Sequence, residues 1–291
     1  AGAPDARLER FLREHGFLPA GRQARFTALA GGVSSDIWRV DLPDGSTICI
    51  KRALPKLKVA ADWYAPVSRN AIEWAWIQFA ARHLPDAVPR PLAHDAEAGL
   101  FAMAYLPPED HPVWKRQLLD GQVEPATAAA AGRLLGSLHL ASSRDAALER
   151  AFDTGANFHA LRLEPYLLAT AAAHPALAPA LQALVERTAA TRLALVHGDV
   201  SPKNILVHDE RLVLLDHEVI HYGDPAFDLG FSLTHLLSKA HHLPALRSRF
   251  AAATVGHWEA YRRAVGRPPW LAELEPRAVH HTLGCLLARV A

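Results

Sequence analysis

The sequence predicts an α+β protein in two parts, a five-stranded antiparallel sheet with one helix followed by a mainly helical part with short hairpins. Three observations predict this class. Up to about Tyr105, short β-type runs alternate with turn residues. Beyond about Ala126, the chain is rich in Ala, Leu and His and mostly helical in pattern. One β-type island, at 193–215, interrupts the helical part.

The first part is expected to be a meander of strands joined by tight turns. Gly-Gly at 31–32 follows the first strand, and Pro-Asp-Gly at 43–45 connects the second and third. Ile72, Trp76 and Phe79 recur at helical spacing, which predicts a helix. The expected elements are an amphipathic helix at 5–15, a helix at 68–82, and strands at 26–30, 37–41, 47–51, 91–93 and 100–105.

The second part is expected to be helical around the β-type island. Leu134, Leu135 and Leu138 form an apolar stripe on a helix at 126–141. Proline suits the first helical position, so we expect one helix over 165–173 and another over 179–191, each beginning with its proline. The remaining expectations are strands at 193–196, 205–207 and 212–215, and helices at 226–240, 246–265 and 270–291.

Composition argues against several classes of protein. The chain has 291 residues and a formal net charge of +1, so it lacks the positive excess that nucleic-acid binding requires. No segment has the pattern of a signal peptide or a membrane span. Cys49 and Cys285 lie in apolar runs and are expected to be buried thiols of a reducing compartment. We expect a cytoplasmic protein without nucleic-acid or membrane partners; its oligomeric state stays open.

The densest polar motif is the loop 197–204, which reads His-Gly-Asp-Val-Ser-Pro-Lys-Asn between two apolar strands. It contains Asp199 and Asn204, and Asp216 follows the next strand. Phosphoryl transfer needs a carboxylate that takes up the proton of the acceptor hydroxyl, and oxygen ligands for Mg²⁺ beside the phosphates. Each of these residues alone is as typical of a turn or a helix cap. Their order and spacing together favour the catalytic interpretation.

Two features of the first part fit nucleotide binding. Lys51 ends the third strand, from which its side chain can reach phosphates, and Glu73 on the following helix can pair with it. The alternatives are an exposed lysine and a solvated glutamate. The glycine turn that contains Gly32, Ser34 and Ser35 can present backbone N–H groups to phosphate oxygens, although such turns between strands are common.

These motifs resemble those of the aminoglycoside phosphotransferase and choline kinase superfamily, the phosphotransferase enzyme family, over nearly the whole chain. The most specific pieces are His-Gly-Asp at 197–199 with Asn204, Asp-His-Glu at 216–218, and Gly-Asp-Pro at 223–225 with Asp228. The resemblance implies a two-lobed protein-kinase-like fold. Its expected parts are a nucleotide-binding lobe at 1–106 with a hinge near 103–106, and a catalytic and substrate-binding lobe at 107–291.

The resemblance also implies roles for single residues. Asp199 is the implied catalytic base, and Asn204 and Asp216 are the implied Mg²⁺ ligands. Lys51, paired with Glu73, is implied to contact the phosphates of the nucleotide. The backbone of the hinge, which includes Met103 and Tyr105, is implied to contact adenine. Glu218 either adds a metal contact or is an exposed loop carboxylate. Asp224 and Asp228 are expected to support the catalytic loop.

We therefore expect a kinase that uses ATP, with GTP left open, and Mg²⁺ to phosphorylate a small-molecule hydroxyl. The acceptor is an aminoglycoside-like antibiotic or a small sugar or amino-alcohol metabolite. Residues 110–291 contain eighteen acidic and eighteen basic residues, and five of the acids belong to the catalytic segment. This balance argues mildly against a polycationic acceptor, which an acidic cleft would favour. A catalytically silent nucleotide-binding module and a metal-dependent phosphohydrolase remain as alternatives.

Overall fold

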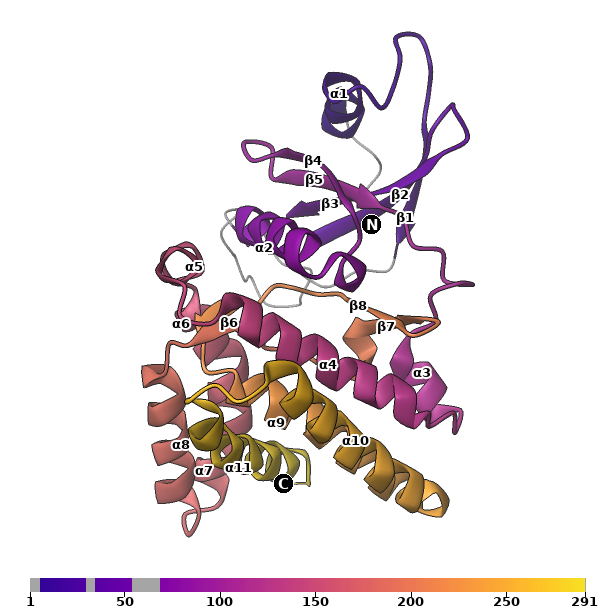
Figure 1. Ribbon diagram of the computed structural model, residues 1–291. Coiled ribbons are helices and arrows are strands. Elements are labelled where there is room, and N and C mark those ends of the chain that lie inside the picture. Colours follow the sequence, from indigo (N-terminus) through magenta and orange to yellow (C-terminus); the bar gives the residue numbers. More distant parts are fainter. Residues whose placement is uncertain (1–5, 30–34, 54–68, 291) are drawn as a thin grey trace. The chain divides into compact units, whose positions relative to one another are not determined.

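The computed structural model describes residues 6–29, 35–53 and 69–290 of the chain (Figure 1). The chain divides into two compact units, Ala1–Pro107 and Pro108–Ala291. In the described residues, no helix is long and apolar enough to cross a membrane. Both cysteines of the chain, Cys49 and Cys285, are buried and form no disulfide.

The first unit is a five-stranded antiparallel sheet in the order β1-β2-β3-β5-β4, as the sequence predicts. Its elements are α1 (Ala6–Glu14), β1 (Arg25–Leu29), β2 (Ser35–Asp41), β3 (Thr47–Ala53), α2 (Arg69–His83), η1 (Pro85–Ala87), β4 (Pro91–Asp95) and β5 (Leu100–Ala104). The turn between β2 and β3 forms at 43–45, where Gly45 has a φ of +88°. That conformation favours glycine.

The two faces of the sheet differ because side chains alternate along each strand. On β3, Ile48 and Ile50 belong to a core cluster that also contains Phe11 of α1. The residues between and after them on β3 alternate to the other face, where Lys51 meets Glu73 of α2. The period of two therefore aims a buried lysine at the helix that follows the strand.

The second unit is mainly helical, with two short antiparallel strand pairs. Its helices are α3 (Trp114–Leu119), α4 (Pro125–Ser142), α5 (Ala146–Ala151), α6 (Gly155–Phe158), η2 (His159–Leu168), α7 (Ala169–Ala173), α8 (Ala178–Ala190), η3 (Pro202–Asn204), α9 (Ala226–His242), η4 (Pro244–Leu246), α10 (Arg247–Val265) and α11 (Leu271–Val290). Strand β6 (Ala194–Val196) pairs with β9 (His221–Gly223), and β7 (Ile205–His208) pairs with β8 (Arg211–Leu214).

Helices α4 and α10 approach closely because α4 carries glycine where they cross. A Cβ on Gly132 would lie 2.0 Å from the carbonyl oxygen of His257, and one on Gly136 would lie 2.7 Å from that of Tyr261. Such contacts exclude any side chain at these positions. The close packing lets the Tyr261 hydroxyl hydrogen-bond Nδ1 of the buried His139, at 2.9 Å.

The expected start of a helix at Pro165 is wrong. The helical path runs from α6 through η2 to α7, and Pro165 lies inside the π-helical segment η2. Proline lacks the N–H that an interior helical residue donates. The buried Leu163 and Leu167 of η2 pack in one cluster with Phe231. This packing holds the helical path together across the proline.

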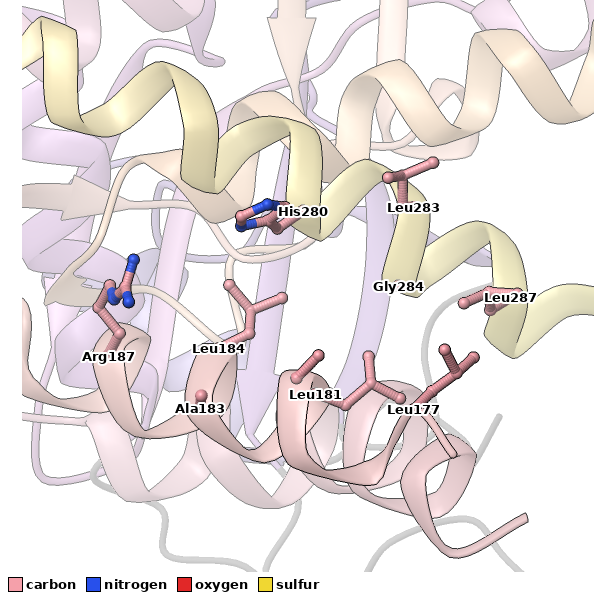
Figure 2. A pocket seen from close by; sticks show the side chains of 10 residues that line it. Leu177, Leu181, Ala183, Leu184, Arg187, His280, Leu283, Gly284 and Leu287 are labelled. Atoms are coloured by element: carbon pink, nitrogen blue, oxygen red, sulfur yellow. The ribbon is translucent and has the colours of Figure 1, made fainter. Parts of the chain in front are cut away.

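Helices α8 and α11 border an apolar pocket of about 370 Å³ (Figure 2). Leu181 and Leu184 of α8, with Leu177 just before that helix, line it on one side, and Leu283 and Leu287 of α11 line it on the other. It lies apart from the polar residues that the sequence singles out.

Candidate active site

The loop 197–204 joins β6 to β7, so a strand fixes each of its ends. Gly198 has a φ of +78°, and a Cβ on it would lie 2.9 Å from Cγ2 of Val219. Both the backbone conformation and the close approach therefore require glycine here. This explains the Gly of the His-Gly-Asp motif in physical terms, because the turn at Gly198 carries the chain into Asp199.

Asp228 holds the start of this loop. The backbone N–H groups of His197 and Gly198 each donate to its carboxylate at 2.8 Å. His139 Nε2 lies 3.2 Å from the same carboxylate. Burial by itself would raise the pKa of Asp228, but the hydrogen bond from His139 and the neighbouring donors outweigh it and lower that pKa. Asp228 is thus a buried anion whose acceptor sites face the loop backbone.

Asp224 has a similar supporting contact at the N-terminus of α9. The guanidinium of Arg277 on α11 binds its carboxylate through two nitrogens, at 2.7 and 3.1 Å. Both side chains are buried. The pair fixes the start of α9, and hence Asp228, against α11.

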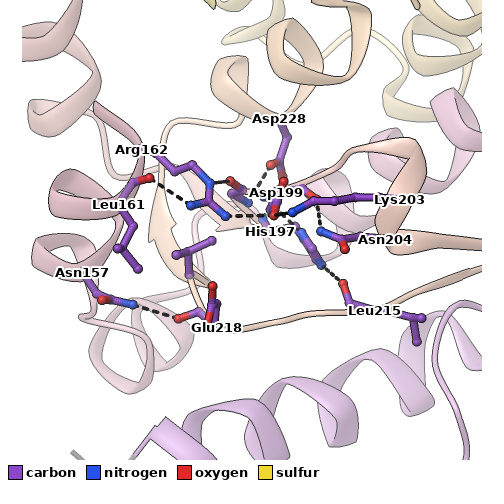
Figure 3. A network of polar contacts seen from close by, with 12 residues as sticks. Asn157, Leu161, Arg162, His197, Asp199, Lys203, Asn204, Leu215, Glu218 and Asp228 are labelled. Carbon is purple, nitrogen blue, oxygen red and sulfur yellow. Dashed lines mark hydrogen bonds and ion pairs between the residues drawn. The ribbon is translucent and has the colours of Figure 1, made fainter. Parts of the chain in front are cut away.

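The carboxylate of Asp199 lies between two cations (Figure 3). Arg162 Nη2 is 2.9 Å and Lys203 Nζ is 3.1 Å from its Oδ2. Arg162 also donates from Nε to the carbonyl of Gly198, at 2.8 Å. Burial would raise the pKa of Asp199, but the charges of Arg162 and Lys203 hold it below the ordinary value. Asp199 is therefore ionised at neutral pH and able to accept a proton.

Asp199 also lines a pocket of about 320 Å³ in the second unit. Ser201, Lys203 and Arg162 form the neighbouring wall. A small molecule in this pocket would meet the ionised carboxylate directly. The pocket thus combines a proton acceptor with room for a hydroxyl compound.

The hairpin β7–β8 brings Asn204 and Asp216 to one end. Ile205 pairs with Leu214, and Leu215 donates its N–H to the carbonyl of Asn204 at 2.8 Å. Asn204 Nδ2 donates to the carbonyl of Asp199 at 3.1 Å. Asp216 follows with a φ of +59°, a left-handed conformation that Asp tolerates better than most residues.

This end of the hairpin offers an amide oxygen and a carboxylate, the hard oxygen donors that Mg²⁺ prefers. Among the described residues, no group of three or more His, Cys, Asp or Glu side chains is arranged to hold a metal ion. Mg²⁺ bound with phosphates needs only one or two protein ligands, so the donor set of Asn204 and Asp216 fits. Glu218 lies further along, where its backbone carbonyl accepts a hydrogen bond from Asn157 Nδ2 at 2.8 Å.

The first unit contains the other candidate residues. Lys51 Nζ lies 2.5 Å from Glu73 Oε2, and both side chains are nearly buried. Ser35 is buried at the start of β2. Gly32 and Ser34, which we expected to contact phosphate, lie outside the described residues.

The expected hinge lies at the end of β5. Met103 pairs with Cys49 on the neighbouring strand. Tyr105 follows the strand, and the guanidinium carbon of Arg39 is 5.0 Å from the centroid of its ring. These contacts hold both residues against the sheet of the first unit.

Sequence reasoning missed Arg162 and Lys203. Lys203 lies four residues after Asp199 within the motif itself, so its spacing was a signal that could have found it. Arg162 lies in η2, well upstream of the motif, and no local pattern links the two segments. The tertiary fold alone brings them together.

Comparison with known proteins identifies the family. Residues 25–264 match the family model of the phosphotransferase enzyme family. The chain is 28% identical over 235 residues to a methylthioribose kinase of Yersinia pseudotuberculosis, a match that covers 72% of this chain and 57% of that protein. The chain thus spans little more than half the length of the curated relatives it matches.

Solved structures show the same fold. The macrolide 2'-phosphotransferase MphH from Brachybacterium faecium aligns with a TM-score of 0.59 and 23% identity, over 98% of this chain and 93% of that one. The amicoumacin kinase hAmiN aligns with a TM-score of 0.60 and 16% identity, over 99% and 87%. With the family match, these likenesses show that the chain belongs to the phosphotransferase enzyme family and has its protein-kinase-like fold.

Proposed function

We propose that the protein transfers the γ-phosphoryl group of ATP to a hydroxyl group of a small molecule. The observation that carries this proposal is Asp199, an ionised carboxylate in the wall of a pocket, on a loop held by Asp228. Such a group can orient an acceptor hydroxyl and take up its proton. The name of the methylthioribose kinase relative supports a sugar-like hydroxyl compound as acceptor.

In the proposed reaction, the hydroxyl oxygen forms a bond to the γ-phosphorus while the bond from that phosphorus to the bridging oxygen breaks. The hydroxyl proton moves to Asp199, and ADP leaves. Arg162 and Lys203 position the carboxylate, since both bind its Oδ2. Asp228 fixes the loop backbone, so the base keeps its place during the transfer.

The nucleotide has candidate ligands in the first unit. In our proposal, Lys51 binds the phosphates of ATP, and its ion pair with Glu73 orients it. Asn204 and Asp216 would hold Mg²⁺, which when bound neutralises phosphate charge. The hAmiN structure, a complex with AMP-PNP and Ca²⁺, supports a nucleotide bound with a divalent cation.

The proposal is tested with Asp199→Asn. This variant is expected to lose at least about 1,000-fold in ADP release with acceptor, since the base is removed. It should keep the thermal stabilisation by ATP and Mg²⁺, because the proposed nucleotide ligands are intact. Wild-type turnover by this variant would refute the assignment.

Two further variants separate the alternatives. Lys51→Met is expected to lose the stabilisation by ATP, whereas Arg25→Met, whose side chain is 77% exposed, should retain it. A silent nucleotide-binding module would bind ATP without releasing ADP for any acceptor. A phosphohydrolase would release phosphate without an acceptor and would not need Lys51.

A further inference from the structure

The pocket beside Asp199 has a strongly positive wall. The loop 197–204, η2, α3, α9 and α11 all contribute to it. Its charged lining residues are one carboxylate, Asp199, and five cations, Lys115, Arg162, Lys203, Lys239 and Arg289. This local excess is invisible in the even charge balance of the chain as a whole.

Three of these cations have no ion-pair partner among the acidic side chains that the structure describes. Arg162 and Lys203 share the single carboxylate of Asp199. Within the described part of the chain, Lys115, Lys239 and Arg289 form no ion pair with an acidic side chain. Their charges therefore remain available to a ligand.

Lys239 is the most informative of the three. Only 8% of it is exposed, and it lies on the same side of α9 as His235, one turn earlier. Burial lowers the pKa of Lys239 to about 8, and the charges of Lys115 and Arg289 add to this effect. A buried ammonium beside two other cations is unfavourable without an anion.

His235 adds no charge to the pocket. Burial, together with Arg289 and Lys239, lowers its pKa to about 3, so the ring is neutral at physiological pH. Arg289 Nη2 is 3.2 Å from His235 Nε2, and an arginine only donates. Nε2 must therefore accept, which orients the guanidinium of Arg289 at the edge of the pocket.

We propose that the acceptor is a small hydroxylated anion, whose carboxylate or phosphate group binds Lys239, Arg289 and Lys115 while its hydroxyl faces Asp199. This inference rests on the proposed function and names its substrate class. Opposite charge on the ligand offsets the mutual repulsion of the three cations, whereas a polycation or a quaternary ammonium ion would add to it. Tyr166 and Phe231 also line the pocket, and the guanidinium carbon of Arg289 lies 5.8 and 5.9 Å from their ring centroids.

The test compares acceptors that share a hydroxyl skeleton and differ in charge. Suitable sets are glycerol, glycerate and glycerol 3-phosphate, and ribose, ribonate and ribose 5-phosphate, with choline and kanamycin as cations. ADP release with ATP and Mg²⁺ is measured for each. We expect kcat/KM of the preferred anion to exceed that of its neutral counterpart by about 10- to 100-fold, as charge-assisted hydrogen bonds allow. The carboxylate and phosphate arms identify which anion the site prefers.

Lys239→Met tests the residue itself. It keeps an unbranched apolar stem and removes the charge, so we expect KM for the preferred anion to rise about 10- to 100-fold and the preference over the neutral counterpart to narrow. Lys239→Arg should restore part of the preference, which a merely structural role would not require. Arg116→Met, a change of a 79% exposed side chain, is the matched control.

The outcomes separate the two proposals. Best turnover of a neutral or cationic acceptor would overturn the charge inference and leave the phosphotransfer intact. If no acceptor releases ADP, the proposed function fails, and calorimetric binding of the same sets decides the inference. Binding of an anion that Lys239→Met abolishes supports it; equal binding of charged and neutral members, or no binding, overturns it.

Discussion

Removing Arg162 should change the pH at which the enzyme loses activity. Its Nη2 lies 2.9 Å from Asp199 Oδ2, with the two side chains 11% and 6% exposed. An opposite charge this close lowers the pKa of a carboxyl by about one to three pH units, and each pH unit corresponds to about 1.4 kcal/mol. In Arg162→Met the raising effect of burial is then less opposed. The acidic limb of kcat/KM should therefore move to higher pH.

The assay is the rate of ADP release at limiting acceptor from about pH 4 to 9. Lys203→Met should move the limb less, because Lys203 is 3.1 Å away and its side chain is 55% exposed. Arg116→Met, which alters only a surface pair with Asp120, should leave it in place. Loss of the bond from Arg162 to the Gly198 carbonyl lowers the height of the profile but not its position. A folded Arg162→Met enzyme with the wild-type profile would refute the reasoning.

Three further predictions follow from the same contacts. Gly198→Ala should lower the free energy of unfolding in urea by about 1–3 kcal/mol, whereas Gly155→Ala, with open space around its Cβ, should not. Asp228→Asn should reduce kcat at least about 10-fold, since hydrogen bonds to a charged acceptor are worth about 1.5–3 kcal/mol. Because the pKa of Asp228 is lowered by folding, its stabilisation is present above its ordinary pKa and lost as the pH falls through the folded value, so the variant's stability should depend less on pH in that acidic range. An anionic acceptor should raise the pKa of Lys239 from about 8, so calorimetry near that pH should show proton uptake on binding that Lys239→Met lacks; a binding heat independent of the buffer would contradict it.

The sheet of the first unit could be predicted because its strands follow simple local rules. Short β-type runs and the turn residues between them, such as those at 43–45, place each strand to within a few residues. Not every short element could be found this way. Strand β9 is three residues long, too short to show a period, and it exists because it pairs with β6. The expectation that Pro165 begins a helix is wrong for a related reason, since tertiary packing overrides the local preference of proline.

Part of the candidate site could also be predicted from local sequence. Asp199 and Asn204 could be predicted because one loop carries both, and Asp216 because only a short hairpin separates it from them. The character of the pocket beside Asp199 could not be predicted, because its cations come from segments distant in sequence. One signal was present: Lys239 interrupts the apolar pattern of α9, one turn after His235. A buried lysine on such a helix points to a ligand or a partner.

The most direct test of phosphoryl transfer to a small hydroxylated anion is phosphorus NMR of a reaction with ATP, Mg²⁺ and the acceptor that the screen selects. We predict one new phosphate ester resonance, formed in equal amount with ADP by the wild-type protein and absent with Asp199→Asn. Inorganic phosphate in place of the ester, or an ester of equal intensity from Asp199→Asn, would contradict the account.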